Sequence, residues 1–288
     1  MSLPVLAYFF IFSYLPLAGT VVAFKNYNYS DGILGSPWNG FENFRYFFTS
    51  GKAFSVTKNT IMFNLIFIAV GTLLSVTAAI LLSEMLGKLF RKTAQTIMFL
   101  PYFISWVTVG AFMYNFFNFE YGMINSVLKS FGMQALDIYS NPNYWYLILP
   151  ALHVWKGLGF GSVIYLAAIM SIDQECYESA SIDGANTFQR IFRITVPMIM
   201  PTMVILILLS IGRILRGDFD MFYQLIGQNG TLFDTTDIID TLVFRSLVGT
   251  QDFGMASAAG LYQSVLCFCI IMFVNSLIKK YQKDYALF

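Results

Sequence analysis

Six long apolar runs are the feature that most constrains the fold of this chain. Each is close to the ~20 residues that a helix needs to cross the hydrocarbon core of a bilayer. They lie at Leu3–Phe24, Asn59–Leu82, Ala94–Phe117, Tyr144–Met170, Met198–Arg216 and Met255–Leu277. Only 11% of the 288 residues are charged, against roughly 25% in a soluble domain. The sequence therefore predicts an all-α integral membrane protein with about six transmembrane helices, in one domain covering residues 1–288.

The distribution of basic residues predicts how these spans are oriented. Two connections and the C-terminal end hold a dense group of them: Lys88, Arg91, Lys92, Arg190, Arg193, Lys279, Lys280 and Lys283. The opposite side spreads its basic residues over longer loops. Because Lys and Arg concentrate in the short cytoplasmic loops of membrane proteins, we expect the dense group, and with it the C-terminus, to be cytoplasmic.

A polar segment, residues 171–197, separates the fourth apolar run from the fifth. Asp173 can cap a first short helix. Gly184 can end that helix, because glycine tolerates the left-handed conformation of a helix stop. Thr187 can cap a second short helix that leads into the next span. The segment is therefore predicted to form a helix–turn–helix elbow outside the membrane.

The order of residues in this elbow resembles the cytoplasmic coupling motif of membrane subunits of ATP-driven, binding-protein-dependent importers. The matching residues are Glu178, Ala180, Asp183, Gly184, Ala185, Ile194 and Pro197. Ser179 departs from the family pattern, which has alanine at this place. The resemblance implies that the elbow docks in a groove of an ATPase subunit and transmits its closure to the membrane helices. An ordinary amphipathic surface loop is the alternative interpretation.

Motifs along the rest of the chain resemble one branch of that family, the LplB-type permeases of complex oligosaccharides. They are AFKNYN at Ala23–Asn28, GSPWNGFENF at Gly35–Phe44, LPYFISW at Leu100–Trp106, IYLAA at Ile164–Ala168 and DIIDT at Asp237–Thr241. The resemblance implies the type I ABC importer permease fold in a bacterial plasma membrane. It also implies a second homologous permease, two cytoplasmic ATPase subunits, an extracellular sugar-binding lipoprotein and an oligosaccharide substrate as partners, and no nucleic acid.

The chain lacks the residue patterns of an enzyme. The pairs Gly51-Lys52 and Gly87-Lys88 lack the other residues of a phosphate-binding loop. His153 is the single histidine, and the three cysteines have no metal-ligand spacing. We therefore expect no catalytic residue, metal or cofactor on this chain, and ATP with its magnesium on the partner ATPase.

Charged residues inside the apolar runs are candidates for a substrate path. Lys156 lies near the middle of the fourth run, where a charge is costly unless it faces a protein interior or an aqueous path. A structural ion pair or an amine that reaches the interface is the alternative. Arg213 and Arg216 share one face of a predicted helix and suit the carboxylate of an acidic sugar. Alternatively, Arg216 pairs with Asp220, four residues further on.

Aromatic rings can stack on the apolar faces of sugars, although most rings in a membrane protein lie in the core or at the interface. The predicted path comprises Trp106, Lys156, Arg213, Arg216, Asp220, Phe222 and Tyr262. Together these features predict an oligosaccharide permease that works by alternating access. An ion-gradient-driven secondary transporter is the alternative, but it commonly carries carboxylates within the membrane, and here Asp and Glu fall in loops or at the ends of spans.

Overall fold

The computed structural model describes residues 3–281. Within that range every regular element is a helix, apart from one isolated bridge between Lys25 and Trp38. Five helical segments are long and apolar enough to cross a membrane, and a sixth span is bent. The predicted all-α membrane fold with about six spans is confirmed. The basic residue Lys283, used to predict the orientation, lies outside the described residues.

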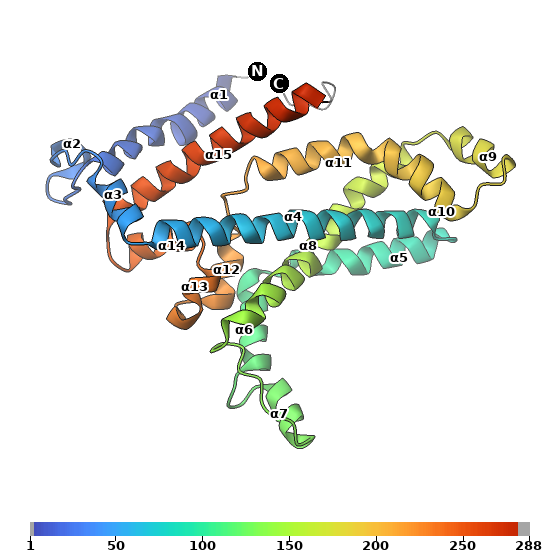
Figure 1. Ribbon diagram of the computed structural model, residues 1–288, viewed down its shortest axis with the longest axis horizontal. Coiled ribbons are helices and arrows are strands. Elements are labelled where there is room, and N and C mark those ends of the chain that lie inside the picture. The colour runs from blue at the N-terminus through green and yellow to red at the C-terminus, as the bar shows by residue number, and fades with distance from the viewer. Residues whose placement is uncertain (1–2, 282–288) are drawn as a thin grey trace.

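Four helices form the central bundle, namely α4 (Lys52–Glu84), α8 (Trp145–Met170), α11 (Val196–Ile211) and α15 (Phe253–Tyr281). Two of them, α4 and α15, are longer than the apolar runs that predict them. The most extensive contact between two helices joins α4 and α8, and Figure 1 shows them at the centre of the molecule. Gly161 permits this contact, because a Cβ atom there would lie 2.4 Å from the Ser75 hydroxyl oxygen.

The third predicted span, Ala94–Phe117, is present but is broken into two helices. It consists of α5 (Lys88–Phe99) with a 3-10 turn at Leu100–Phe103, followed by α6 (Trp106–Phe117) at an angle of 88°. Pro101 begins the break, since proline supplies no N–H for the helix. Ser105 is extended, and its hydroxyl caps α6 by accepting a hydrogen bond of 3.2 Å from the Thr108 N–H.

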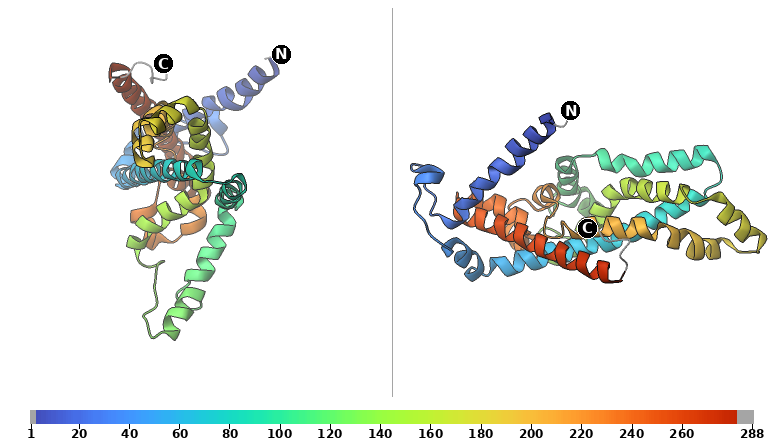
Figure 2. Two further views of the ribbon diagram at one scale, coloured as in Figure 1. Left: turned by 90° about the vertical axis from the view of Figure 1, so that its right-hand side faces the viewer. Right: turned by 90° about the horizontal axis from the view of Figure 1, so that it is seen from above.

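The first span leaves the bundle. It starts as α1 (Leu3–Phe9), continues as a π-helical turn (Phe10–Tyr14) and ends as a 3-10 helix (Leu15–Phe24). Its last part packs against α15, and Figure 2 shows α1 projecting away from the other spans. Only 6% of the span is buried, so its apolar side chains are free to contact lipid or another subunit.

Short helices fill the connections between the spans. They are α2 (Gly32–Gly35), α3 (Glu42–Thr49), α7 (Met123–Ser130), α12 (Phe219–Ile226), α13 (Phe233–Thr236) and α14 (Ile239–Val248), with 3-10 turns at Pro142–Tyr144 and Gly230–Leu232. The side chains of Phe63, Trp145 and Phe222 form part of a buried cluster that packs α4, α6, α8 and α12 together.

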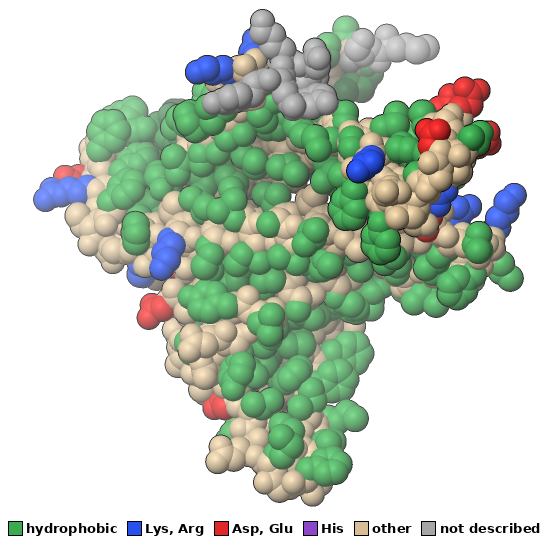
Figure 3. Space-filling view, turned by 45° about the vertical axis from the view of Figure 1, so that its right-hand side comes forward, with side chains coloured by type: hydrophobic (Ala, Val, Ile, Leu, Met, Phe, Trp, Pro, Cys, Tyr) green, Lys and Arg blue, Asp and Glu red, His purple; other side chains and the backbone are tan. Residues whose placement is uncertain are grey.

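The polar segment forms the end of the molecule opposite α2 and α3 (Figure 1). It contains α9 (Gln174–Ile182), α10 (Thr187–Arg190) and a π-helical turn (Ile191–Thr195) that continues into α11. Thr187–Ile211 is therefore one helical segment of 25 residues. Figure 3 shows charged side chains gathered toward the ends of the molecule, with hydrophobic side chains covering the surface between them. A membrane-spanning protein requires this distribution.

Candidate coupling segment and substrate path

The elbow is built by local capping, much as predicted. The Asp173 side chain caps α9, its carboxylate accepting a hydrogen bond of 3.1 Å from the Glu175 N–H. Gly184 has a φ of +76°, the left-handed conformation that ends the helix. The Ala185 N–H donates to the Ala180 carbonyl at 2.9 Å and closes the turn. The sequence predictions for Asp173 and Gly184 are confirmed.

The cap of the second elbow helix was predicted one residue too late. Asn186, rather than Thr187, is the capping residue, because Asn186 is extended and Thr187 is already helical. The Asn186 side chain accepts a hydrogen bond of 2.9 Å from the Gln189 N–H, and the Gln189 side chain accepts one of 2.8 Å from the Asn186 N–H. This reciprocal capping box stabilises the start of α10.

Two contacts fix the elbow to the membrane helices. Arg190 lies 3.6 Å from Glu84 at the end of α4. The hydroxyl groups of Tyr177 and Thr195 lie 2.9 Å apart and join α9 to the base of α11. The elbow is therefore tied to both α4 and α11.

The predicted coupling residues are mostly at the surface. Glu178, Ser179, Asp183, Gly184 and Pro197 are exposed, and Ala180 and Ala185 are half-buried. The large side chains of Ile182, Phe188 and Phe192 lie exposed on the same elbow, with Phe188 74% exposed. The sequence analysis did not select Phe188 and Phe192, although apolar residues four apart in a polar segment indicate an amphipathic helix face.

A groove of about 410 Å³ runs between α4, α8 and the end of α11. Its polar wall includes Asn64, Thr72, Ser75, His153, Ser210, Arg213 and Arg216. The His153 ring stacks on Phe67, with ring centroids 4.1 Å apart. The groove therefore combines aromatic faces, hydrogen-bonding groups and two guanidinium groups.

Arg213 and Arg216 lie on a non-helical segment, residues 212–218, which three helices hold in place. The Asn64 amide of α4 donates to the Ile214 carbonyl at 3.0 Å and to the Arg216 carbonyl at 3.3 Å. From α15, the Gln263 amide donates to the Leu215 carbonyl at 2.6 Å.

The third support comes from α14. One oxygen of the Asp240 carboxylate accepts hydrogen bonds from the Gly217 N–H at 2.8 Å and from the Gln263 amide at 3.1 Å. In this segment, side chains thus form the hydrogen bonds to backbone groups that other backbone groups would form in a helix.

The predicted Arg216–Asp220 pair is absent from the ion pairs of residues 3–281. The prediction assumed a continuous helix, in which residues four apart lie on one face. The helix ends at Ile211, and residues 216–218 have no regular structure. Arg213, Arg216 and Asp220 are all exposed.

Lys156 supplies hydrogen-bond donors to the backbone at the break in the third span. Its ammonium group donates hydrogen bonds to the carbonyl oxygens of Pro101 at 3.4 Å and Tyr102 at 2.9 Å, and also to that of Ile104. The structural ion pair considered as one alternative is therefore wrong, and the partners are backbone carbonyls. The ammonium also lies 5.3 Å from the ring centre of Trp106.

Trp106 connects this break to α12. Its indole N–H donates to the Asp218 carboxylate at 3.1 Å, and the same carboxylate caps α12 by accepting from the Met221 N–H at 3.2 Å. Burial raises the pKa of the Asp218 carboxyl above its ordinary value, while these two hydrogen bonds lower it. The contacts give Trp106 a defined structural position.

Two other predicted path residues lie in packed surroundings. Phe222 is 1% exposed in the cluster around α4 and α12. Tyr262 packs edge-on against Phe47 and Phe48, and its hydroxyl lies 3.2 Å from that of Thr57. Of the predicted path residues, Arg213 and Arg216 line the groove.

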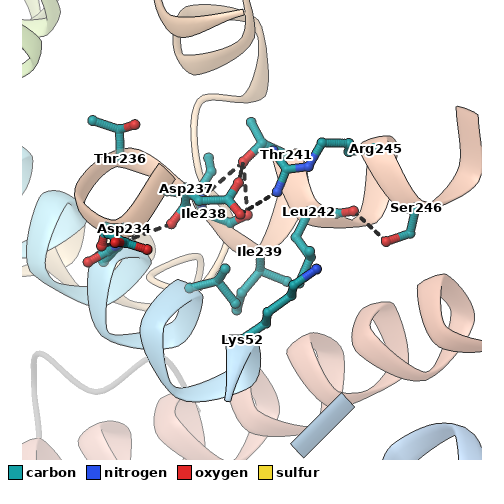
Figure 4. A network of polar contacts seen from close by, with 12 residues as sticks. Lys52, Asp234, Thr236, Asp237, Ile238, Ile239, Thr241, Leu242, Arg245 and Ser246 are labelled. Atoms are coloured by element: carbon teal, nitrogen blue, oxygen red, sulfur yellow. Dashed lines mark hydrogen bonds and ion pairs between the residues drawn. The ribbon is translucent and has the colours of Figure 1, made fainter. Parts of the chain in front are cut away.

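The DIIDT motif joins α13, α14 and α4, as Figure 4 shows. Asp237 pairs with Arg245 and accepts a hydrogen bond of 2.7 Å from Thr241. The Asn59 amide of α4 donates to the Asp237 carbonyl at 3.1 Å. The motif therefore stabilises the connection that carries Asp240.

A family model described as the binding-protein-dependent transport system inner membrane component matches residues 71–283. The chain belongs to this family. It is thus the permease subunit of an ABC transport system, and the alternative of an ion-gradient-driven transporter is excluded.

Individual relatives can be aligned with nearly the whole length of this chain. The protein LplB of Bacillus subtilis (strain 168) is 32% identical over 284 residues, 99% of this chain and 89% of that protein. A solved bacterial ABC transporter involved in the import of the acidic polysaccharide alginate has a chain with a TM-score of 0.87 and 34% identity. The match covers 97% of this chain and 94% of that chain. A further structure, of a bacterial alginate ABC transporter with its alginate pentasaccharide-bound periplasmic protein, has a TM-score of 0.87 and 33% identity. The latter match covers 98% of this chain and 93% of that one.

Proposed function

We propose that this permease forms one half of the path by which an importer moves oligosaccharides across the membrane. The observation that carries the proposal is the groove between α4, α8 and α11, which places two arginines, hydrogen-bonding groups and stacked rings beside one another. Such a combination suits a chain of sugar units, which present hydroxyl groups at their edges and apolar faces for stacking. The import of a polysaccharide by the similar solved transporter supports the same substrate class.

The energy source in this proposal is ATP hydrolysis on two separate cytoplasmic subunits. The elbow, with its exposed Ile182, Phe188 and Phe192, supplies the docking surface for them. This assignment puts the elbow and the C-terminus in the cytoplasm, in agreement with the concentration of basic residues at Lys88–Lys92. A second homologous permease completes the path, and an extracellular binding lipoprotein delivers the sugar.

The substrate proposed for the groove is acidic. Guanidinium groups form charge-assisted hydrogen bonds with carboxylates, and among residues 3–281 no acidic side chain forms an ion pair with Arg213 or Arg216. A uronic acid unit would supply the missing negative charge. The acidic polysaccharide imported by the similar transporter supports this choice.

Reconstitution of the complete importer in liposomes tests the function. With ATP on the ATPase side and loaded binding protein on the other, radiolabelled oligosaccharide is expected to accumulate, and ionophores that collapse ion gradients are expected to leave uptake unchanged. Uptake that persists without ATP, or that stops with the ionophores, would contradict the proposal.

A further inference from the structure

A second groove, of about 340 Å³, lies between the start of α5 and the end of α8. The α5 side presents Lys88, Arg91, Lys92 and Gln95, and the α8 side presents apolar residues that include Ala167 and Met170. One wall is thus cationic and the other wall is part of a membrane span. The transport function proposed above does not use this groove.

The cations of the groove have no negative partner within the described chain. None of the ion pairs among residues 3–281 includes Lys88, Arg91 or Lys92. The nearest acidic residue along the chain, Glu84, is paired with Arg190. A cluster of unneutralised cations at one place attracts an anion.

Exposed apolar side chains surround the groove, as they do at a site that holds a lipid. Leu89 is 80% exposed and Phe90 is 65% exposed beside the cations, and Met170 is 63% exposed on the opposite wall. Such side chains lower their free energy in contact with hydrocarbon. A ligand that fits both walls carries a negatively charged phosphate and an apolar chain.

We infer that this groove binds the phosphate group of an anionic phospholipid, with an acyl chain along the Ala167–Met170 side of α8. Lys88, Arg91 and Lys92 donate charge-assisted hydrogen bonds to the phosphate oxygens, and Gln95 offers an amide to the same group. Basic pockets between helices at the cytoplasmic end of a membrane protein bind anionic lipid headgroups in this way. An acidic surface of the ATPase is the competing occupant, and the apolar wall on α8 favours the lipid.

The test uses the complete importer, purified from phosphatidylcholine nanodiscs that contain phosphatidylglycerol. Native mass spectrometry counts the phosphatidylglycerol molecules and the ATPase subunits retained on each complex. The variant is Arg91→Gln with Lys92→Gln, and the matched control is Lys279→Gln with Lys280→Gln, which removes two basic residues from the last turn of α15. We expect affinity for phosphatidylglycerol to fall on the order of ten- to thirtyfold in the groove variant and to stay near the original value in the control.

Each other outcome overturns the inference. If the groove variant retains as much phosphatidylglycerol as the original complex, the groove does not bind this lipid. Equal loss in variant and control shows a general effect of surface charge. Loss of ATPase subunits from the groove variant, with phosphatidylglycerol retained, assigns the groove to the ATPase. The transport assay is separate, so the proposed function stands whichever result is obtained.

Discussion

The ammonium group of Lys156 donates a hydrogen bond of 2.9 Å to the carbonyl oxygen of Tyr102, across the break in the third span. The two residues lie on different helices, and the same group also reaches the carbonyls of Pro101 and Ile104. A cation near the C-terminal end of a helix compensates the carbonyl groups that have no N–H partner. A side chain of α8 therefore stabilises the bend between α5 and α6.

Replacing Lys156 by methionine should destabilise the permease. The variant keeps an apolar side chain of similar length but leaves the Tyr102 and Ile104 carbonyls without this donor, while the Pro101 carbonyl keeps the Ile104 N–H. An unsatisfied buried polar group costs about 1–3 kcal/mol. Thermal unfolding of the purified complex is expected at a lower temperature. Lys58→Met, at an exposed position of α4, is the control, and an equal shift in both variants would contradict the role of Lys156.

Gly184→Val should uncouple ATP hydrolysis on the ATPase subunits from transport through the permease. The φ of +76° at this position is an outlier for a β-branched residue, and asparagine tolerates it far better. Valine therefore strains the elbow turn, whereas Gly184→Asn keeps it. ATP hydrolysis stimulated by substrate should fall in the valine variant and persist in the asparagine variant. Normal stimulation in both would argue against the coupling role of the elbow.

Arg213→Gln and Arg216→Gln should lower the uptake of an acidic oligosaccharide more than that of a neutral one of equal size. A hydrogen bond to a charged group contributes about 1.5–3 kcal/mol, so losing one weakens binding by roughly ten- to a hundredfold. The ratio of the two uptake rates is the measurement, since a folding defect lowers both rates. Asp220→Asn, which removes a nearby exposed charge that pairs with neither arginine, is the control for a general effect of charge. An unchanged ratio means that the arginines do not meet the substrate charge.

Asn64→Ala should loosen the segment that carries both arginines. The substitution removes donors to the Ile214 and Arg216 carbonyls, at a cost of about 1–3 kcal/mol for the unsatisfied groups. We expect a lower unfolding temperature and slower uptake of the acidic oligosaccharide. Asn115→Ala is the matched control, because the Asn115 amide donates within its own helix, to the Ala111 carbonyl. Similar behaviour of the two variants would show that Asn64 has no special role.

Sequence reasoning predicted the spans and the elbow because both follow from local patterns. Hydropathy identifies a span from the average over about 20 residues, and a helix stop at Gly184 follows from one residue type. The same average conceals the break at Ile104–Ser105, because the residues immediately on both sides of it are mostly apolar. Pro101 was the available signal, but proline alone does not distinguish a kink from a bend of 88°.

The partners of Lys156 and of the arginine segment depend on long-range contacts. Lys156 and Pro101 are 55 residues apart, and Asn64 and Ile214 are 150 apart. In both pairs the acceptor is a backbone carbonyl, which every residue possesses, so no residue type marks it. The Arg216–Asp220 prediction failed for a related reason. Residues four apart lie on the same face only within a helix, and this segment is not helical.

The helical segment Thr187–Ile211 has a mechanical consequence. Its 25 residues form a rod about 37 Å long, at 1.5 Å per residue. One end of the rod is the second arm of the elbow, and the other end lies two residues before Arg213. A displacement imposed at the elbow is therefore transmitted along one continuous helical segment, through the π-helical turn at Ile191–Thr195, to the edge of the groove.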